Sequence, residues 1–87
     1  MKIVIDEKIP YLKDALSSAG FTVVAKACSD INSNDVVSAE ALFVRTRTKC
    51  NSELLDGSSI RFIGTATIGY DHIDAEFCSR NGIAWKN

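Results

Sequence analysis

Short apolar blocks separated by polar segments run through the whole chain and predict five strands. The blocks are rich in β-branched and aromatic residues and are closed by turn-forming or charged residues, a composition typical of strands. They occupy residues 2–5, 21–25, 41–44, 61–64 and 83–85. The first block is too short to be the apolar core of a signal peptide, and no block has the length of a membrane span.

A clear helical periodicity follows the first predicted strand. Apolar residues recur there at intervals of three and four, as on the buried face of an amphipathic helix: Leu12, Ala15, Leu16 and Ala19. Pro10 suits the first helical position, where its missing N–H costs nothing, and Gly20 suits a left-handed residue that ends the helix. The spacing therefore predicts a helix that begins at Pro10 and buries those four side chains.

Three shorter helices are predicted between the later strands. The polar loop 29–35 caps the first of them, a short helix over Val36 and Val37. Residues 51–57 form the second, with Gly57 as its terminator. Asp71 and Asp74 are both candidate N-caps for the third, which precedes the last strand.

This alternation of strands and helices predicts an α/β fold with a parallel sheet. Parallel strands need crossover connections, and because those connections are right-handed the helices cover both faces. For five strands we expect the order 2-1-3-4-5, the common flavodoxin-like, doubly wound arrangement. The 87 residues make one small domain of modest stability.

Composition narrows the classes of protein that need to be considered. A hydrophobic fraction of 46%, a charged fraction of 24% and a net charge of -1 are ordinary for a globular chain and give no sign of nucleic-acid binding. The cysteines, Cys28, Cys50 and Cys78, are widely spaced and form no CxxC pair, so they encode neither a disulfide framework nor a zinc site. We expect free thiols, a cytoplasmic location and no membrane partner.

Two polar stretches carry the candidate chemistry, and each lies at the carboxyl end of a predicted strand. The first is residues 45–49, with sequence RTRTK, and the second is residues 64–72, with sequence GTATIGYDH. The carboxyl ends of parallel strands share one edge of a sheet, and that edge is where such sheets bind ligands. Cations, hydroxyls and glycine-exposed amides together favour an anion, such as a small carboxylate or a phosphate ester.

A purely structural interpretation competes with this one. If the third strand continues beyond Val44, alternation places Arg45, Arg47 and Lys49 on one side and the threonines on the other, which describes an ordinary solvated edge equally well. Gly69 could serve only a turn, because glycine adopts positive φ without strain.

His72 and the acidic pair Asp6-Glu7 are further candidates. His72 lies between Asp71 and Asp74, and neighbouring carboxylates favour the imidazolium, but it has no nucleophile or metal ligand at a recognisable spacing. A structural role near a helix start is therefore favoured. The acidic pair could form a receiver-type pocket, which would need an aspartate where the third strand instead runs into arginine.

The sequence also resembles a known family. Residues 39–51, the pair Leu54-Leu55 and residues 62–74 resemble the substrate domain of the D-isomer-specific 2-hydroxyacid dehydrogenases, and residues 2–11 are similar to the amino terminus of some members. The resemblance extends over all 87 residues. It is strongest to the members that act on a phosphorylated four-carbon hydroxy acid.

The resemblance implies NAD-dependent oxidation of 4-phosphoerythronate at C2 to the 2-oxo acid, on the route to pyridoxal 5′-phosphate. It implies that threonine hydroxyls contact the substrate, that two cations lie nearby and that backbone amides hold an oxyanion. The residues concerned are Arg45, Thr46, Lys49, Thr67, Ile68 and Gly69. The catalytic residues and the glycine fingerprint for NAD belong to the family's cofactor domain, and the sequence contains no G-x-G-x-x-G, Walker or H-E-x-x-H motif.

Two hypotheses of different classes follow. The first is an amino-terminal fragment that forms the substrate part of a dehydrogenase, is inactive and binds no NAD alone, and self-associates or forms a homodimer through uncovered apolar surface. The second is a free-standing anion-binding or receiver-like module that acts through a partner.

Overall fold

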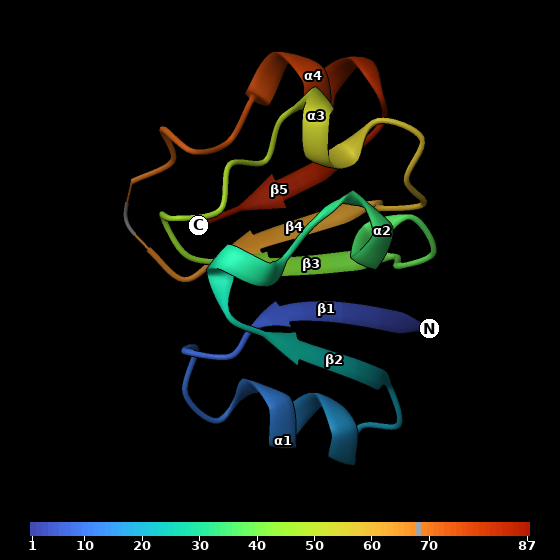
Figure 1. Cartoon of the computed structure of the whole chain (residues 1–87), viewed down its shortest axis with the longest axis vertical. Helices are drawn as coiled ribbons and strands as arrows, with labels where there is room; N and C mark the ends of the chain where they lie inside the picture. Colours follow the sequence, from blue (N-terminus) through green and yellow to red (C-terminus); the bar gives the residue numbers. More distant parts are fainter. Residues whose placement is uncertain (68) are drawn as a thin grey trace.

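Five short strands pair in parallel, in the order β2-β1-β3-β4-β5, to form the centre of the molecule. The computed structural model describes residues 1–67 and 69–87 (Figure 1). Within them the strands are β1 (Lys2–Asp6), β2 (Thr22–Lys26), β3 (Ala41–Val44), β4 (Phe62–Thr65) and β5 (Ala84–Lys86). The predicted α/β class, parallel pairing and strand order are confirmed.

The helices are short, and side-chain caps fix where three of them begin. They are α1 (Leu12–Ser18), the 3₁₀ turn η1 (Cys28–Asp30), α2 (Ser33–Val36), α3 (Ser52–Leu55) and α4 (Ala75–Arg80). Asn32, Asn51 and Asp74 each accept a hydrogen bond from a backbone N–H in the first turn of the helix that follows. Of the two predicted caps for the last helix, Asp74 is therefore the one used.

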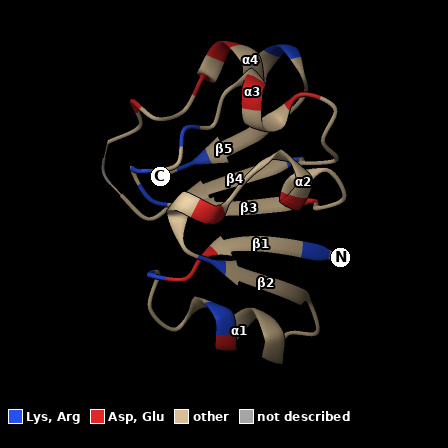
Figure 2. Cartoon of the chain, in the orientation of Figure 1, with Lys and Arg blue, Asp and Glu red and all other residues tan. Residues whose placement is uncertain are grey.

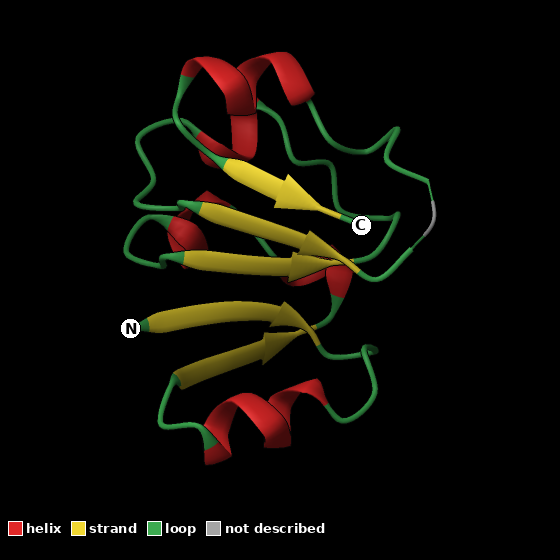
Figure 3. Cartoon of the chain, turned by 180° about the vertical axis from the view of Figure 1, so that it is seen from behind, coloured by secondary structure: helices red, strands yellow, loops and turns green. Residues whose placement is uncertain are grey.

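Helices cover the two faces of the sheet unequally. Side chains of α2, α3 and α4 pack with Val4, Leu42 and Ile63 in the larger cluster of buried residues. Leu12 and Leu16 of α1 pack on the opposite face, in a smaller cluster. Figure 3 shows the sheet from that side, with β3 and β4 in front of α2. The larger core therefore lies between the sheet and the three later helices.

Helix α1 differs from its prediction in where it begins and in which side chains it buries. It begins at Leu12 rather than Pro10, because Asp6 accepts hydrogen bonds from the N–H groups of Lys8 and Ile9 and folds this segment into a turn. Its N-cap, Tyr11, has a φ of 65° and makes no side-chain cap. Ala15 and Ala19 are exposed, since α1 packs mainly along β2 at the margin of the sheet.

The two middle helices also differ from their predicted bounds, since α2 begins earlier and α3 is shorter. Helix α2 begins at Ser33, inside the stretch that was expected to be loop, and Val37 is its C-cap and 53% exposed. Helix α3 ends at Leu55 after about one turn, and Gly57 adopts a positive φ of 74° beyond it. These differences arise because the local caps decide the boundaries, while the strands around them keep their predicted places.

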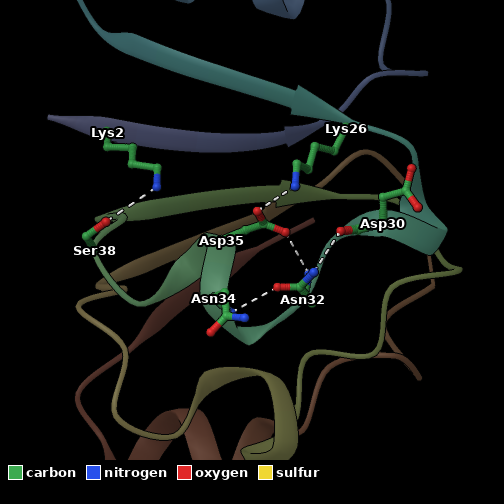
Figure 4. Close-up of polar contacts among 7 residues, drawn as sticks. All are labelled: Lys2, Lys26, Asp30, Asn32, Asn34, Asp35 and Ser38. Carbon is green, nitrogen blue, oxygen red and sulfur yellow. Dashed lines mark hydrogen bonds and ion pairs between the residues drawn. The ribbon is translucent and has the colours of Figure 1, made fainter.

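A network of polar contacts ties α2 to the end of β2 (Figure 4). Asn32 and Asp35 form a capping box: Asn32 Oδ1 accepts from the N–H of Asn34 at 3.0 Å, and Asp35 Oδ2 accepts from the N–H of Asn32 at 2.9 Å. Lys26 Nζ lies 2.7 Å from Asp35 Oδ1. One carboxylate thus joins the first turn of α2 to β2.

We predict that Asp35→Ala destabilises the fold more than Lys26→Met. The aspartate substitution removes the capping box and the ion pair, at a cost of about 1–2 kcal/mol, whereas the lysine substitution removes only a partly exposed pair worth less than about 1 kcal/mol. Urea denaturation of both variants measures the difference. Equal losses in the two variants would contradict a role for the capping box.

The same carboxylate gives this prediction a pH dependence. The hydrogen bond from Lys26 lowers the pKa of Asp35 below its ordinary value, so its contribution is complete above about pH 4 and is lost as the pH falls through the folded pKa.

Candidate functional site

Beyond the carboxyl end of the sheet, the loops after β3 and β4 are joined by a two-bond bridge. The N–H of Cys50 donates to the carbonyl of His72 at 2.8 Å, and the N–H of Asp74 donates to the carbonyl of Cys50 at 2.9 Å. Cys50 and Ile73 are the paired residues of this parallel bridge. The two polar stretches predicted to face one another therefore do lie side by side.

The first loop turns immediately after β3 instead of continuing as a strand. The N–H of Thr48 donates to the carbonyl of Arg45 at 3.3 Å. Arg45 is half-buried and Thr48 is buried, while Thr46 and Lys49 are exposed. Because β3 ends at Val44, the alternation of cations and threonines that a continued strand would give does not arise.

Positive charge gathers at this edge of the sheet. Figure 2 shows Lys and Arg positions around the loops that the strand arrows point towards, close to the C-terminus. The salt bridge found among the described residues joins Lys26 to Asp35, and none involves Arg45, Arg47 or Lys49. These three cations are thus free of carboxylate partners within residues 1–67 and 69–87.

Two cavities open beside the first loop. The larger, of about 420 Å³, lies between residues 28–33 and residues 47–54. The smaller, of about 330 Å³, lies between the two bridged loops and is lined by Thr46, Lys49, Asn51, Asp71, His72, Ile73 and Asp74. Lys49 lines both cavities, so its ammonium group can serve an anion in either.

Two buried side chains next to these cavities are those of Thr48 and Cys50. Thr48 is 5% exposed, and its hydroxyl is the one buried side-chain polar atom in the described chain without a hydrogen-bond partner. Burial raises the pKa of the Cys50 thiol to about 12, so this thiol stays protonated and unreactive. Cys50 therefore has a structural role in the bridge.

The second loop is held by a chain of side-chain hydrogen bonds. Thr65 Oγ1 lies 2.8 Å from His72 Nε2 and 2.8 Å from Thr67 Oγ1. Thr67 Oγ1 in turn donates to the carbonyl of Gly69 at 3.0 Å. Thr65 and His72 are 7% and 9% exposed, so the inner part of this chain is shielded from water.

The charge state of His72 differs from what its sequence neighbours suggested. Burial lowers its pKa, and Asp71 only partly opposes this shift. The carboxylate of Asp74 is engaged at the start of α4, where it accepts from the N–H of Phe77 at 3.0 Å. Of the two carboxylates expected to favour the imidazolium, Asp71 does raise the pKa of His72, but burial outweighs it and the net shift is downward.

The structure brings the predicted site residues to one edge but does not gather them in one cavity. Thr46 and Lys49 line the smaller cavity, whereas Arg45 lies at the base of the first loop. Thr67 and Gly69 bond each other in the second loop, and Ile68 lies outside the described residues. Val44 pairs with Thr65, so β3 and β4 deliver both loops to the same end of the sheet.

Sequence reasoning missed several residues that the structure places here. Asn51, Asp71 and Asp74 line the smaller cavity, although two of them were recognised only as possible caps. Thr65 was not singled out, because nothing in the local pattern shows that a strand residue meets a histidine seven positions later.

Asp6, the first residue of the acidic pair at the end of β1, has a local structural role. Asp6 is 1% exposed, and its Oδ1 accepts from the N–H of Lys8 at 2.9 Å.

Among the residues that the structure describes, no group of three or more His, Cys, Asp or Glu side chains is placed to hold a metal ion. No described helix has the length and apolar character needed to cross a membrane.

Comparison with known sequences identifies similar proteins over the whole chain. Residues 2–87 match the D-isomer specific 2-hydroxyacid dehydrogenase catalytic domain. Over 87 residues, all of this chain, it is 51% identical to the erythronate-4-phosphate dehydrogenase of Bacteroides thetaiotaomicron and 49% identical to that of Teredinibacter turnerae. It covers 25% and 23% of them, so it spans about a quarter of the length of these curated relatives.

Solved structures share the fold. D-lactate dehydrogenase from Aquifex aeolicus, complexed with NAD and lactic acid, matches with a TM-score of 0.76 and 26% identity over 98% of this chain and 27% of that chain. The NAD+-bound 3-phosphoglycerate dehydrogenase of Entamoeba histolytica matches with a TM-score of 0.72 and 28% identity over 100% of this chain and 32% of that one.

The state of His72 predicts that stability rises with pH through the range in which histidine titrates. Because burial lowers the pKa of His72, the unfolded chain binds a proton at a pH where the folded chain does not. The free energy of unfolding should be complete above about pH 6.5 and fall as the pH drops towards the folded pKa. Urea denaturation over this range measures the slope.

His72→Gln provides the matched control, because glutamine retains an amide donor near the position of Nε2 but does not titrate. His72 is the one histidine of the sequence, so the slope should be absent in this variant. A wild-type free energy of unfolding that stays flat between about pH 7 and about pH 5 would refute the assignment.

Proposed function

The chain belongs to the D-isomer specific 2-hydroxyacid dehydrogenase family, and we propose that it forms the substrate-binding part of an NAD-dependent 4-phosphoerythronate dehydrogenase. The reaction would oxidise the hydroxyl at C2 to a 2-oxo acid, as a step towards pyridoxal 5′-phosphate. Similarity over the whole chain to erythronate-4-phosphate dehydrogenases supports this member of the family. The alternative of a free-standing receiver-like module gains no support, because Asp6 is engaged in a local turn.

The observation that carries the proposal is the group of cations and hydroxyls beside the bridged loops, where Arg45, Arg47 and Lys49 have no carboxylate partner among the described residues. Arg45 and Lys49 would attract the phosphate and carboxylate of the substrate, and Thr46 and Thr67 would supply hydroxyl contacts. Backbone amides at Thr67 and Gly69 would hold an oxyanion, as in other anion-binding loops. Each charge-assisted hydrogen bond contributes about 1.5–3 kcal/mol, so a few of them suffice for weak binding after the costs of ordering.

We propose that the catalytic groups and the NAD site lie outside these 87 residues. NAD would accept the hydride removed from C2. The chain's own residues do not fit a dinucleotide: β1 runs into the turn at Asp6, and α1 begins only at Leu12 behind a capless Tyr11, without a glycine-rich turn to approach a pyrophosphate. Residues 1–87 would then be the amino-terminal part of the substrate domain, and its role is to bind and orient.

A cytoplasmic location is part of the same proposal. Cys28, Cys50 and Cys78 are free thiols in the structure, and two of them are buried. Such cysteine use is typical of a reducing compartment.

In the complete dehydrogenase we predict that Thr67→Val raises the Michaelis constant for 4-phosphoerythronate roughly tenfold, with little change in kcat. Valine keeps the shape of threonine but removes the hydroxyl, so ground-state and transition-state binding should weaken together. Thr67→Ser keeps the hydroxyl and is the matched control. Steady-state kinetics with 4-phosphoerythronate and with D-lactate as a phosphate-free comparison provides the measurement.

Two outcomes would count against the proposal in different ways. Turnover of lactate in preference to 4-phosphoerythronate would reject the substrate, and an unchanged Michaelis constant in Thr67→Val would reject the site.

We also propose that the chain self-associates or forms a homodimer. On the face that carries α1, no other described helix covers the half-buried rings of Phe43 and Phe62, whose centroids lie 5.9 Å apart. Contiguous apolar surface of this kind favours association.

The expected result is a sedimentation coefficient that rises with protein concentration. Phe43→Lys should reduce the rise, because it places a charge in the centre of the proposed contact, whereas Tyr11→Lys, at a residue that is 88% exposed on the turn before α1, should leave it unchanged. A monomeric profile at every concentration would exclude this contact.

A further inference from the structure

The direction of each side-chain hydrogen bond in the second loop follows from counting the protons that each hydroxyl and the histidine ring can donate. A carbonyl only accepts, so Thr67 must donate its single hydroxyl proton to Gly69 O, 3.0 Å away. Thr67 can then only accept from Thr65, whose hydroxyl lies 2.8 Å away. Thr65 has now given its own proton, so it must accept from His72 Nε2 at 2.8 Å.

This chain of donors fixes the tautomer of His72. The ring must carry a proton on Nε2, because the opposite tautomer would leave Thr65 with two acceptors and one proton to share between them. If the ring takes up a second proton, that proton goes to Nδ1 and the bond from Nε2 to Thr65 survives. The direction of the relay is thus the same in both charge states of the histidine.

We propose that His72 is a positioning residue that acts through Thr65 to hold the hydroxyl of Thr67 as a hydrogen-bond donor for an anionic oxygen of the substrate. This role rests on the proposed function, in which Thr67 contacts the substrate. In the chain without ligand, Gly69 O receives the donated proton. A substrate oxyanion that takes the place of this carbonyl needs no reversal of the relay.

Three features of the structure make the relay suitable for this task. Its inner members, His72 and Thr65, are more than nine-tenths buried, so their hydrogen bonds are shielded from water. The backbone of His72 is fixed by the bond that its carbonyl accepts from Cys50. Thr65 is the last residue of β4, so the relay starts on the rigid sheet and ends on the loop that carries Gly69. Donors that are oriented before binding lower the cost of holding an anion.

The tautomer can be measured directly on the 87-residue chain, because His72 is its one histidine. Long-range ¹H–¹⁵N correlation spectra of the ring distinguish a proton on Nε2 from a proton on Nδ1. We expect the Nε2–H form in the wild type and in Thr65→Ser, which keeps the acceptor. In Thr65→Val the acceptor is lost, and the preference should weaken. A wild-type ring protonated on Nδ1 would overturn the relay whatever the protein binds.

Anion binding tests whether the relay positions Thr67 or only stabilises the fold. Inorganic phosphate and 4-phosphoerythronate are titrated into the wild type, His72→Gln, His72→Leu, Thr65→Ser and Thr65→Val, each first shown to be folded by circular dichroism. The loss of an oriented donor should weaken binding about tenfold in His72→Leu and Thr65→Val. Binding by His72→Gln and Thr65→Ser should stay close to that of the wild type.

The two sets of results separate the inference from the function on which it rests. If His72→Leu and Thr65→Val both fold and bind the anion as tightly as the wild type, the positioning role is overturned. If one of the two variants does not fold, the other decides alone. Wild-type binding of phosphate without binding of 4-phosphoerythronate would overturn the proposed substrate and leave the relay to be judged on phosphate. If neither anion binds, the positioning role fails, and the tautomer still decides the direction of the relay.

Discussion

The arrangement of the carboxyl edge depends on the bridge between Cys50 and Ile73. Outside the sheet, the loops after β3 and β4 have no ladder to hold them, and two backbone hydrogen bonds of 2.8 and 2.9 Å replace it. The side chain of Cys50 is fully buried at the point where the two loops meet, and cysteine suits this position because it is small and behaves as an apolar residue. Without this contact, Thr46 and Thr67 would be related only by the distant pairing of their strands.

The bridge also links the loops to the helices behind them. Asn51 follows Cys50 directly and caps α3, while Asp74 follows Ile73 directly and caps α4. Asp74 uses its N–H for the bridge and its carboxylate for the cap, so one residue fixes the direction of the loop and the start of the helix. The cavity between the loops is therefore bounded by residues that are already held by the fold.

Much of the fold could be predicted from the sequence because strand and helix periodicities are local signals. The strand order was expected only because 2-1-3-4-5 is the common doubly wound arrangement for five strands. The start of α1 was not foreseen, since the carboxylate and the carbonyl of Asp6 both accept hydrogen bonds that fold residues 6–9 into a turn. For the site, the sequence identified both loops but not the turn after Arg45 or the partnership of Thr65 with His72. Those depend on distances between residues that only the folded chain brings together.

The position of β1 between β2 and β3 has a consequence for the rate of folding. Ile3 pairs with Val23 on one side and with Ala41 on the other, so the central strand is completed by a segment far along the chain. Closing that loop costs conformational entropy before the core contacts of Val4 and Leu42 can stabilise the pairing. We therefore expect this chain to fold more slowly than a helical bundle of the same length, with docking of β3 onto β1 as the step that limits the rate.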